Sequence, residues 1–242
     1  MMKKALLLTT AVMLLLAACG KKAQPKEKTE SIGFNNTQPG DSAIYGLVCD
    51  GSTDSVLVLL PFEGGDPDTF NIIRAFVERR IYGRPHIGDK LAVILNTDSI
   101  GDVQMTINVN MLRGEWKYLI SPTLRHHREG TPALPDSIRR RLLSPREYTL
   151  RLKTGGEAYN IGSMSGRNDD GMSPIQFPKA RRYTSWHLFN GRLVLVNDSS
   201  SQQHPDTATI LMLRRDSLLL SFPDHQQLYY SKKRETEGDR GK

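Results

Sequence analysis

The sequence predicts a mainly β protein, in which a small antiparallel sheet or barrel is followed by a second β-barrel, complete or incomplete, with one short helix. Three observations support this fold class. Short apolar runs recur through most of the chain, some of them alternate apolar and polar residues with period two, and turn-forming residues separate them. This pattern is typical of strands joined by tight turns.

The first residues have the order of a secretory signal peptide. A short positive start is followed by an apolar run, and the small residues Ala17 and Ala18 precede Cys19. An apolar run of about a dozen residues is too short to span a bilayer, which needs about twenty. The Leu-Ala-Ala-Cys sequence looks like a lipobox, since its cysteine offers a thiol for lipid transfer. We therefore predict a signal peptide over residues 1–18 and lipidation of Cys19.

Residues 19–40 are predicted to form a lipidated, flexible tether. Their composition changes to polar and charged residues that bury too little surface to order the segment, and the charged tail at residues 232–242 is expected to be disordered for the same reason. Lipid on Cys19 would hold the protein at a membrane of the cell envelope. Because lysine, and not aspartate, follows Gly20, the outer membrane is preferred, on its periplasmic or surface face.

Four strand-like runs predict a small β domain over residues 41–110. The runs are residues 43–49, 55–61, 90–95 and 103–109. Residues 50–54 between the first two runs have the turn chemistry of a hairpin, and the last run alternates with period two. The segment at residues 69–82 fits either a helical face or a strand, and we favour a strand.

A second β domain is predicted over residues 111–231. Asn190 and Gly191 supply two residues that can take positive φ, as a type I′ hairpin turn requires. Proline, glycine and arginine are frequent over residues 122–178, where we expect no regular run of meander strands and a single helix at 135–143. The predicted strands are residues 184–189, 192–195, 206–213 and 217–222.

Short motifs in this half of the chain carry a family resemblance. Gly114 and Trp116 open the unit, Trp186 begins a Trp-x-Leu-x-Asn-Gly-x-Leu-x-Leu sequence, and an Asp-Thr-Ala-Thr-Ile-Leu sequence starts at Asp206. These motifs resemble the lipocalin-like domains of bacterial lipoproteins. The resemblance covers roughly the last half of the chain and implies a lipocalin-like β-barrel, while the broken middle segment leaves its closure into a complete calyx open.

A second resemblance lies near the start of the folded part. Residues 45–56 are similar to the start of the copper-stress lipoprotein NlpE family, in which a Tyr-x-Gly strand leads into a Cys-x-x-Cys turn. Here Ser52 stands at the second cysteine position, so the metal or redox chemistry of that pattern does not transfer. With Cys19 taken by lipid, Cys49 has no disulfide partner. We interpret Cys49 as a small buried residue at a strand end, with a reactive thiol as the alternative.

Catalytic, metal and nucleic-acid functions lack a sequence signal. His126 and His127 form the only histidine pair, but neighbours on an extended chain point to opposite sides, whereas catalytic zinc needs three converging ligands. Residues 162–166 place Met164 where a nucleophile elbow needs serine. The net charge is +7, and the basic residues form scattered pairs and triplets with no aromatic stacking platform among them. We therefore expect no enzyme activity, no metal or other cofactor, and no nucleic-acid partner.

What remains is a lipid-anchored, non-catalytic binding module. Two hypotheses stay open. A carrier of a small apolar or lipid ligand predicts an internal cavity with few charges, whereas a scaffold or stress-signalling lipoprotein with an envelope protein partner predicts a filled core with an exposed apolar patch or free sheet edge. The large aromatic residues of the second domain are either ligand wall or core. The ligand-binding candidates are Trp116, Tyr118, Trp186 and Phe189, and Tyr229 and Tyr230 are large residues of the same unit.

Overall fold

The computed structural model describes residues 38–99, 101–124, 135–162, 175–176, 181–197 and 204–231. The predicted signal peptide, Cys19, nearly all of the tether and the charged tail lie outside these ranges. The described residues belong to one compact unit, residues 33–242. Of these residues 53% are in strands and 10% are helical, which confirms the mainly β fold class. The structure has three short helices in this part of the chain, where one was predicted.

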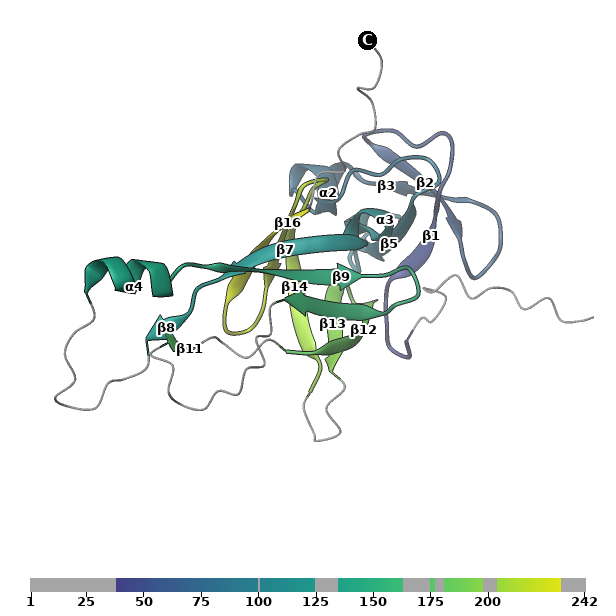
Figure 1. Cartoon of the computed structure of the whole chain (residues 1–242). Helices are drawn as coiled ribbons and strands as arrows, with labels where there is room; N and C mark the ends of the chain where they lie inside the picture. The colour runs from purple at the N-terminus through teal and green to yellow at the C-terminus, as the bar shows by residue number, and fades with distance from the viewer. Residues whose placement is uncertain are drawn as a thin grey trace, which may run out of the picture. The chain divides into compact units, whose positions relative to one another are not determined.

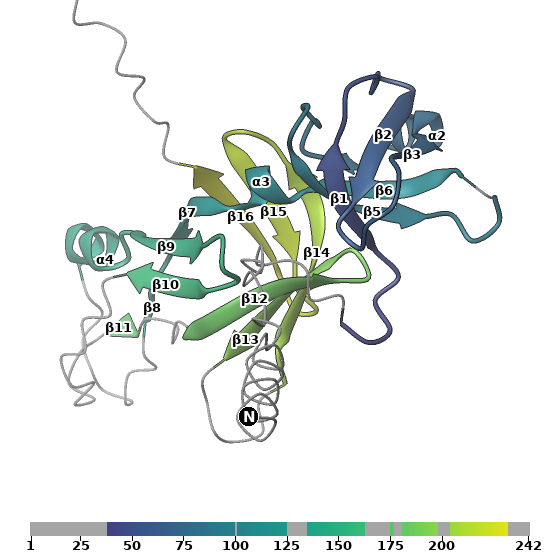
Figure 2. The same cartoon turned by 90° about the vertical axis from the view of Figure 1, so that its right-hand side faces the viewer.

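The smaller sheet has six strands in the order β3-β2-β1-β5-β6-β4 (Figure 2). All neighbours are antiparallel except β4, which runs parallel to β6. The four runs predicted from the sequence form the four adjacent strands β2, β1, β5 and β6, as expected for a small antiparallel sheet. The strands are β1 (Ile44–Val48), β2 (Val56–Pro61), β3 (Asp68–Asn71), β4 (Ile81–Tyr82), β5 (Lys90–Leu95) and β6 (Val103–Asn108).

The strand favoured over residues 69–82 is wrong for its centre. After β3 the chain forms the short helix α2 (Ile73–Val77), whose first N–H, that of Ile73, donates to Asn71 Oδ1 at 3.1 Å. Ile72 and Ala75 are buried against the sheet, while Ile73, Phe76 and Val77 point outward. A helix of one turn has too short a pattern to be separated from a strand by periodicity alone.

The larger sheet has eight antiparallel strands in the order β10-β9-β7-β16-β15-β14-β13-β12 (Figure 1 and Figure 2). Except for β10 and β12, which are the two edges, each strand pairs with the next of these strands along the chain, and β16 pairs with β7. Between β10 and β12 the seam is bridged at Glu157 and Ser185, and Trp186 N–H donates to Gly156 O at 2.7 Å. The sheet is therefore a meander nearly closed into a barrel. Its strands are β7 (Gly114–Ile120), β9 (Arg146–Leu152), β10 (Ala158–Gly162), β12 (Tyr183–Phe189), β13 (Arg192–Asn197), β14 (Asp206–Leu213), β15 (Ser217–Ser221) and β16 (Gln226–Ser231).

The segment in which no meander strands were expected supplies two of the eight. In β9, Tyr148, Leu150 and Leu152 face the interior with period two, and polar or charged residues lie between them. The charged residues hid the alternation. The helix α4 (Asp136–Leu142) confirms the helix predicted there, and a two-stranded sheet pairs β8 (Thr123–Leu124) with β11 (Ile175–Gln176).

The predicted turn between β12 and β13 is confirmed. Asn190 has φ 48° and Gly191 has φ 73°, the two positive values of a type I′ turn. The turn lies against the smaller sheet, where a Cβ on Gly191 would be 2.5 Å from Ile94 Cδ1 and 2.7 Å from Met105 Sδ. Glycine is therefore required at this position for two reasons, the positive φ and the lack of space for a Cβ.

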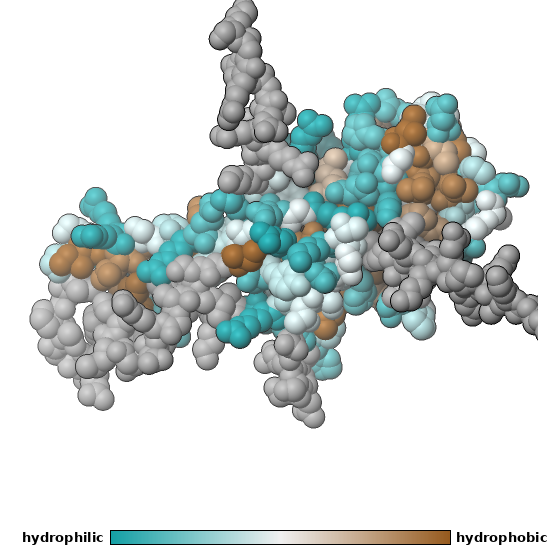
Figure 3. Space-filling view, turned by 45° about the vertical axis from the view of Figure 1, so that its right-hand side comes forward, coloured by the Kyte–Doolittle hydropathy of each residue, from teal (hydrophilic) through white to brown (hydrophobic). Residues whose placement is uncertain are grey.

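The interior of the barrel is filled. Trp116 and Trp186 are each 2% exposed and pack in a core cluster that also contains Tyr45 and Ile107 of the smaller sheet. A second cluster fills the space between the other face of the smaller sheet and α2. Side chains occupy the interior of small barrels in this way, which leaves no deep calyx. The outer part of the smaller sheet, in contrast, carries partly exposed apolar residues, and Figure 3 shows apolar surface gathered over this sheet.

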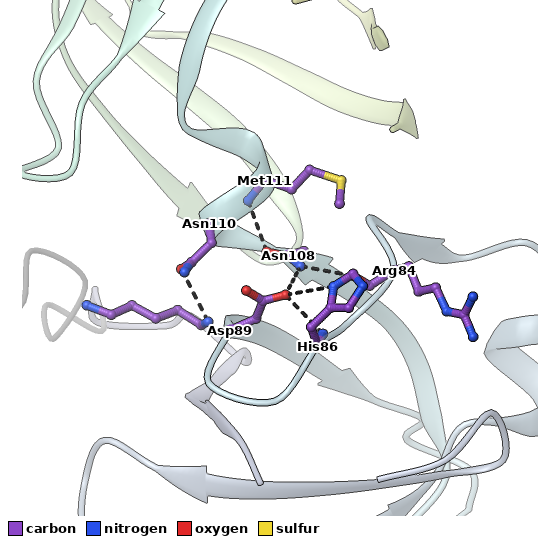
Figure 4. A network of polar contacts seen from close by, with 7 residues as sticks. Arg84, His86, Asp89, Asn108, Asn110 and Met111 are labelled. Carbon is purple, nitrogen blue, oxygen red and sulfur yellow. Dashed lines mark hydrogen bonds and ion pairs between the residues drawn. The ribbon is translucent and has the colours of Figure 1, made fainter. Parts of the chain in front are cut away.

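A buried polar network fixes the passage from the smaller sheet to the barrel (Figure 4). Asn108 is fully buried, and its Oδ1 accepts a hydrogen bond from the N–H of Met111 at 3.0 Å, which caps the short helix α3 (Val109–Leu112). The Asn108 amide donates to Asp89 Oδ2 at 2.7 Å, and the same oxygen accepts the N–H of His86 at 2.9 Å. Because each of these contacts satisfies a buried or terminal polar group, we interpret the network as structural.

Candidate functional site

The two predicted tryptophans lie in the packed core. Trp116 Nε1–H donates to Leu112 O at 2.8 Å, and Trp186 Nε1–H donates to Lys153 O at 3.0 Å. A buried indole needs such a partner, because an unpaired N–H in an apolar core is costly. Both side chains are thus held by the protein itself and do not face an open cavity.

Tyr118 and Phe189 lie in different places. Tyr118 lines a pocket at one end of the barrel, together with Tyr183 at the start of β12. Phe189 is at the other end of β12, half-buried beside the turn, where a Cβ on Gly40 would be 3.9 Å from its Cζ. The four ligand-binding residues predicted from the sequence are therefore not brought together, and Tyr118 alone lines this pocket.

We call this hollow the barrel-mouth pocket. Its volume is about 750 Å³, within the range of sites for small molecules. It lies where β7 and β10 end and where β12, β14 and β16 begin, since antiparallel strands alternate in direction around the barrel. Its lining includes Tyr118, Asn160, Arg181, Tyr183, Asp206, Phe222, Asp224, His225, Gln227 and Tyr229.

Aromatic rings form one wall of the barrel-mouth pocket. The rings of Tyr118 and Tyr229 have centroids 5.0 Å apart at an interplanar angle of 58°, and Tyr148 lies 5.8 Å from Tyr118 behind them. On the loop between β15 and β16, Phe222 stacks on His225 with centroids 4.9 Å apart. These faces can cover the apolar part of a ligand.

Polar groups line the rest of the pocket. Asp206 accepts hydrogen bonds from the Tyr183 hydroxyl at 2.8 Å and from the Arg181 guanidinium. The side-chain amide of Asn160 donates to Arg181 O at 2.8 Å and accepts from the Tyr118 hydroxyl at 3.3 Å. Each of these groups is fixed by another, so the polar side of the pocket is held in position before a ligand arrives.

The Tyr229 hydroxyl differs from those of Tyr118 and Tyr183, which donate to Asn160 and Asp206. Tyr229 is only 5% exposed and lines the pocket, yet within the described part of the chain its hydroxyl has no hydrogen-bond partner. Burial raises the pKa of Tyr229, and the nearby Tyr118 and Tyr183 raise it further. Burial also raises the pKa of Tyr118. Both hydroxyls therefore stay protonated at neutral pH, and while that of Tyr118 donates to Asn160, that of Tyr229 can donate to a ligand.

The charged side chains of the pocket have partners within it. Arg181 is paired with Asp206, and His225 Nδ1 lies 2.7 Å from Asp224 Oδ1. The pocket therefore suits a ligand with an apolar body and neutral polar groups better than a strongly charged one. Chemically, it can bind by stacking and by hydrogen bonds.

Other residues singled out from the sequence lie elsewhere. Cys49 is free and partly buried, with its Sγ 3.7 Å from Leu47 O. His126 and His127, and all of residues 162–166 except the first, fall outside the described residues. Among the described residues, no group of three or more His, Cys, Asp or Glu side chains could hold a metal ion. The helices described here are all too short or too polar to cross a membrane.

Most of the polar lining could not be found from the sequence. Asn160, Arg181, Tyr183 and Asp206 come from three separate segments, and each resembles an ordinary residue near a strand end. Their meeting depends on the order and register of the meander. One signal is that Tyr183 and Asp206 each lie at the start of a strand. It becomes useful only when the strand order is known, because that order shows that the two strand starts lie at the same end of the barrel.

No protein-family model matches the chain, and neither a curated protein nor a solved structure does. The fold and the site therefore define a class only, a mostly β protein with a nearly closed barrel and a pocket at its mouth.

Proposed function

We propose that this chain is an exported lipoprotein, held by lipid on Cys19 at the outer membrane, whose barrel is a non-catalytic binding module for a small apolar or lipid-like ligand. The observation that carries the binding proposal is the Tyr229 hydroxyl, which lines the barrel-mouth pocket without a hydrogen-bond partner among the described residues. This oxygen is not among the fully buried side-chain atoms that lack a partner, so it reaches the solvent of the pocket, where a ligand atom can replace water.

The filled interior limits where the ligand binds. Trp116 and Trp186 occupy the space that a deep calyx would need. A ligand is consequently held at the mouth, with its apolar part on Tyr118 and Phe222 and a neutral polar group near Tyr229 and Asn160. Hydroxyl, amide or ester groups have the hydrogen-bonding chemistry for that position.

The lipid anchor rests on the N-terminal sequence. Ala17, Ala18 and Cys19 have the order of a lipoprotein cleavage site. Incorporation of labelled palmitate into the wild-type chain, and its loss in Cys19→Ser, is the expected result. Equal labelling of both proteins would contradict the anchor.

Binding is tested by NMR with the isotope-labelled chain from Gly20 to the C-terminus, which includes the whole compact unit. The probe is an organic extract of the host envelope. We expect amide shifts at Asn160, Arg181 and Asp206 and none at Phe189. Shifts confined to the Phe189 end, or absent everywhere, would contradict the proposal.

A matched pair of variants sharpens this test. Tyr229→Phe removes the pocket hydroxyl, and Tyr230→Phe removes the hydroxyl of the next residue, which is 51% exposed and not in the pocket lining. A lost hydrogen bond of about 1 kcal/mol predicts roughly fivefold weaker binding for Tyr229→Phe. Tyr230→Phe should bind like the wild type.

A further inference from the structure

A second hollow lies outside the barrel, between α2 and β4 on one side and the outer face of β14 and β15 on the other. We call it the α2–β14 groove. Its volume is about 1240 Å³. The backbone N–H of Gly83 donates to Leu213 O at 3.1 Å, which joins the two sides below it. Its lining includes Asp54, Leu57, Ile72, Phe76, Val77, Arg79, Ile81, Tyr82, Arg84, Leu211, Met212, Arg214 and Leu219.

Large apolar side chains of the α2–β14 groove are open to solvent. Phe76 is 59% exposed, Val77 is 73% exposed and Leu211 is 41% exposed. The helix carries two of them outward because Ile72 and Ala75 take its buried side. Apolar residues concentrated in one hollow in this way are typical of an interaction site, whereas singly scattered ones are not.

Leu211 lies at a β-bulge. The register of β14 on β15 shifts between Ile210, which pairs with Leu220, and Met212, which pairs with Leu219. Leu211 is the extra residue and has no partner in the ladder. Bulges of this kind redirect a side chain and are frequent beside functional sites. Here Leu211, which faces outward in the alternation of β14, lines the groove.

The charged residues of the groove are mostly positive. Arg84 is 3.4 Å from Asp54, its ion-pair partner on the turn between β1 and β2. Arg79 and Arg214 also line the groove, and within the described ranges neither side chain has an ion-pair partner. An apolar hollow with two unpaired arginines is complementary to an apolar segment that carries acidic side chains.

Arg79 is held in a conformation that arginine rarely adopts. Its φ is 56°, directly after the end of α2, where its N–H donates to Phe76 O at 3.1 Å and the N–H of Arg80 donates to Ala75 O at 2.8 Å. Glycine or asparagine usually occupies this position, because other side chains are strained there. The sequence places a cationic side chain at the groove in spite of that strain, and such outliers cluster at binding sites.

We propose that the α2–β14 groove docks a short amphipathic segment of a partner protein, whose large apolar side chains fill the groove and whose acidic side chains pair with Arg79 and Arg214. A concave surface with walls from two sheets accommodates protruding side chains, whereas a bilayer presents a flat surface. The site is separate from the barrel-mouth pocket, so either can bind without the other.

The test is a selection of random dodecapeptides displayed on phage against the chain from Gly20 to the C-terminus. Expected winners combine spaced Leu, Ile, Phe or Trp with Asp or Glu. Their binding should weaken at least about tenfold in Arg79→Glu/Arg214→Glu and in Val77→Asp. The matched controls are Arg192→Glu and Ile161→Asp, exposed positions outside the groove, which should leave binding unchanged.

Several results would overturn the docking proposal. They are an absence of enriched peptides, enrichment without acidic residues, or binding that the groove variants leave intact. Two further measurements address other occupants. Sedimentation with phosphatidylglycerol-containing vesicles that is lost in Val77→Asp, without peptide binding, would assign the groove to a membrane surface. A dimer by analytical ultracentrifugation that Val77→Asp dissociates would assign it to a second copy of the chain.

Discussion

The Asp41 carboxylate accepts a hydrogen bond at 2.9 Å from the backbone N–H of Asn190, 149 residues further along the chain. The side chain of Asn190 returns the contact, because its Oδ1 accepts the N–H of Ser42 at 2.9 Å. This reciprocal pair holds the turn between β12 and β13 against the start of β1. The small sheet and the barrel are thus joined by specific contacts as well as by a shared core cluster.

Replacing Asp41 is expected to destabilise the fold. Its carboxylate also accepts the Tyr45 hydroxyl at 2.7 Å and the N–H of Ala43 at 3.1 Å. Asp41→Ala leaves these donors without their acceptor and should lower the free energy of unfolding by about 1–3 kcal/mol. Urea denaturation measures the change, with the exposed Asp66→Ala as control. A loss equal to that of the control would mean that the contact does not hold the turn.

Gly191 is expected to tolerate no side chain. In Gly191→Ala, the positive φ and the contacts with Ile94 and Met105 both oppose the added Cβ. Gly88→Ala is the matched control, because Gly88 has φ 85° and open space around its Cβ position. We expect about 1–2 kcal/mol of destabilisation for the control and about 1–3 kcal/mol more for Gly191→Ala by thermal or urea unfolding. Equal losses would show that the close approach costs nothing.

Stability is expected to fall in alkaline solution. The ordinary pKa of tyrosine is 10.0, and burial raises the pKa of Tyr118 and Tyr229 in the folded protein. The contribution of these two neutral hydroxyls to the free energy of unfolding is present in full below pH 10.0. Above it the unfolded chain loses protons that the folded chain keeps, so stability declines as pH rises. Urea titrations from neutral pH to about pH 11 should give a smaller decline for Tyr229→Phe. An unchanged decline would contradict the role of burial.

Trp186 is expected to support the core and not the ligand. Trp186→Phe removes the donor that pairs with Lys153 O and leaves space in the barrel, so we expect a loss of about 2–4 kcal/mol in unfolding free energy. Binding at the barrel-mouth pocket should be within about twofold of the wild type, because Trp186 is not in its lining. Weaker binding in a variant that remains folded would place the tryptophan in the ligand site.

The sequence predicted elements whose signals are local. Asn190 and Gly191 defined a turn by their own conformational preferences, and the alternation in β6 and the apolar runs of β1, β2 and β5 gave strands that the structure confirms. The helix α4 was found from Pro135 and the pattern that follows it. In each case the residues that form the element also carry its signal.

Elements and contacts that depend on the rest of the molecule were missed. In β9, the charged residues Arg146, Glu147 and Arg151 obscured the alternation of buried and exposed residues. The other face of this strand is buried only because the rest of the barrel covers it. The helix α2 was read as a strand, because a helix of five residues is too short for its pattern to exclude a strand. The lining of the barrel-mouth pocket requires the order of eight strands, which no local pattern contains.

The most direct measurement of the central claim is native mass spectrometry of the mature chain, purified from the host envelope and transferred to a volatile buffer. The account predicts a retained small-molecule mass that is released on denaturation, kept in Tyr230→Phe and reduced in Tyr229→Phe. A bare chain mass in repeated preparations, or a retained mass that Tyr229→Phe leaves unchanged, would contradict a ligand site at the mouth of the barrel.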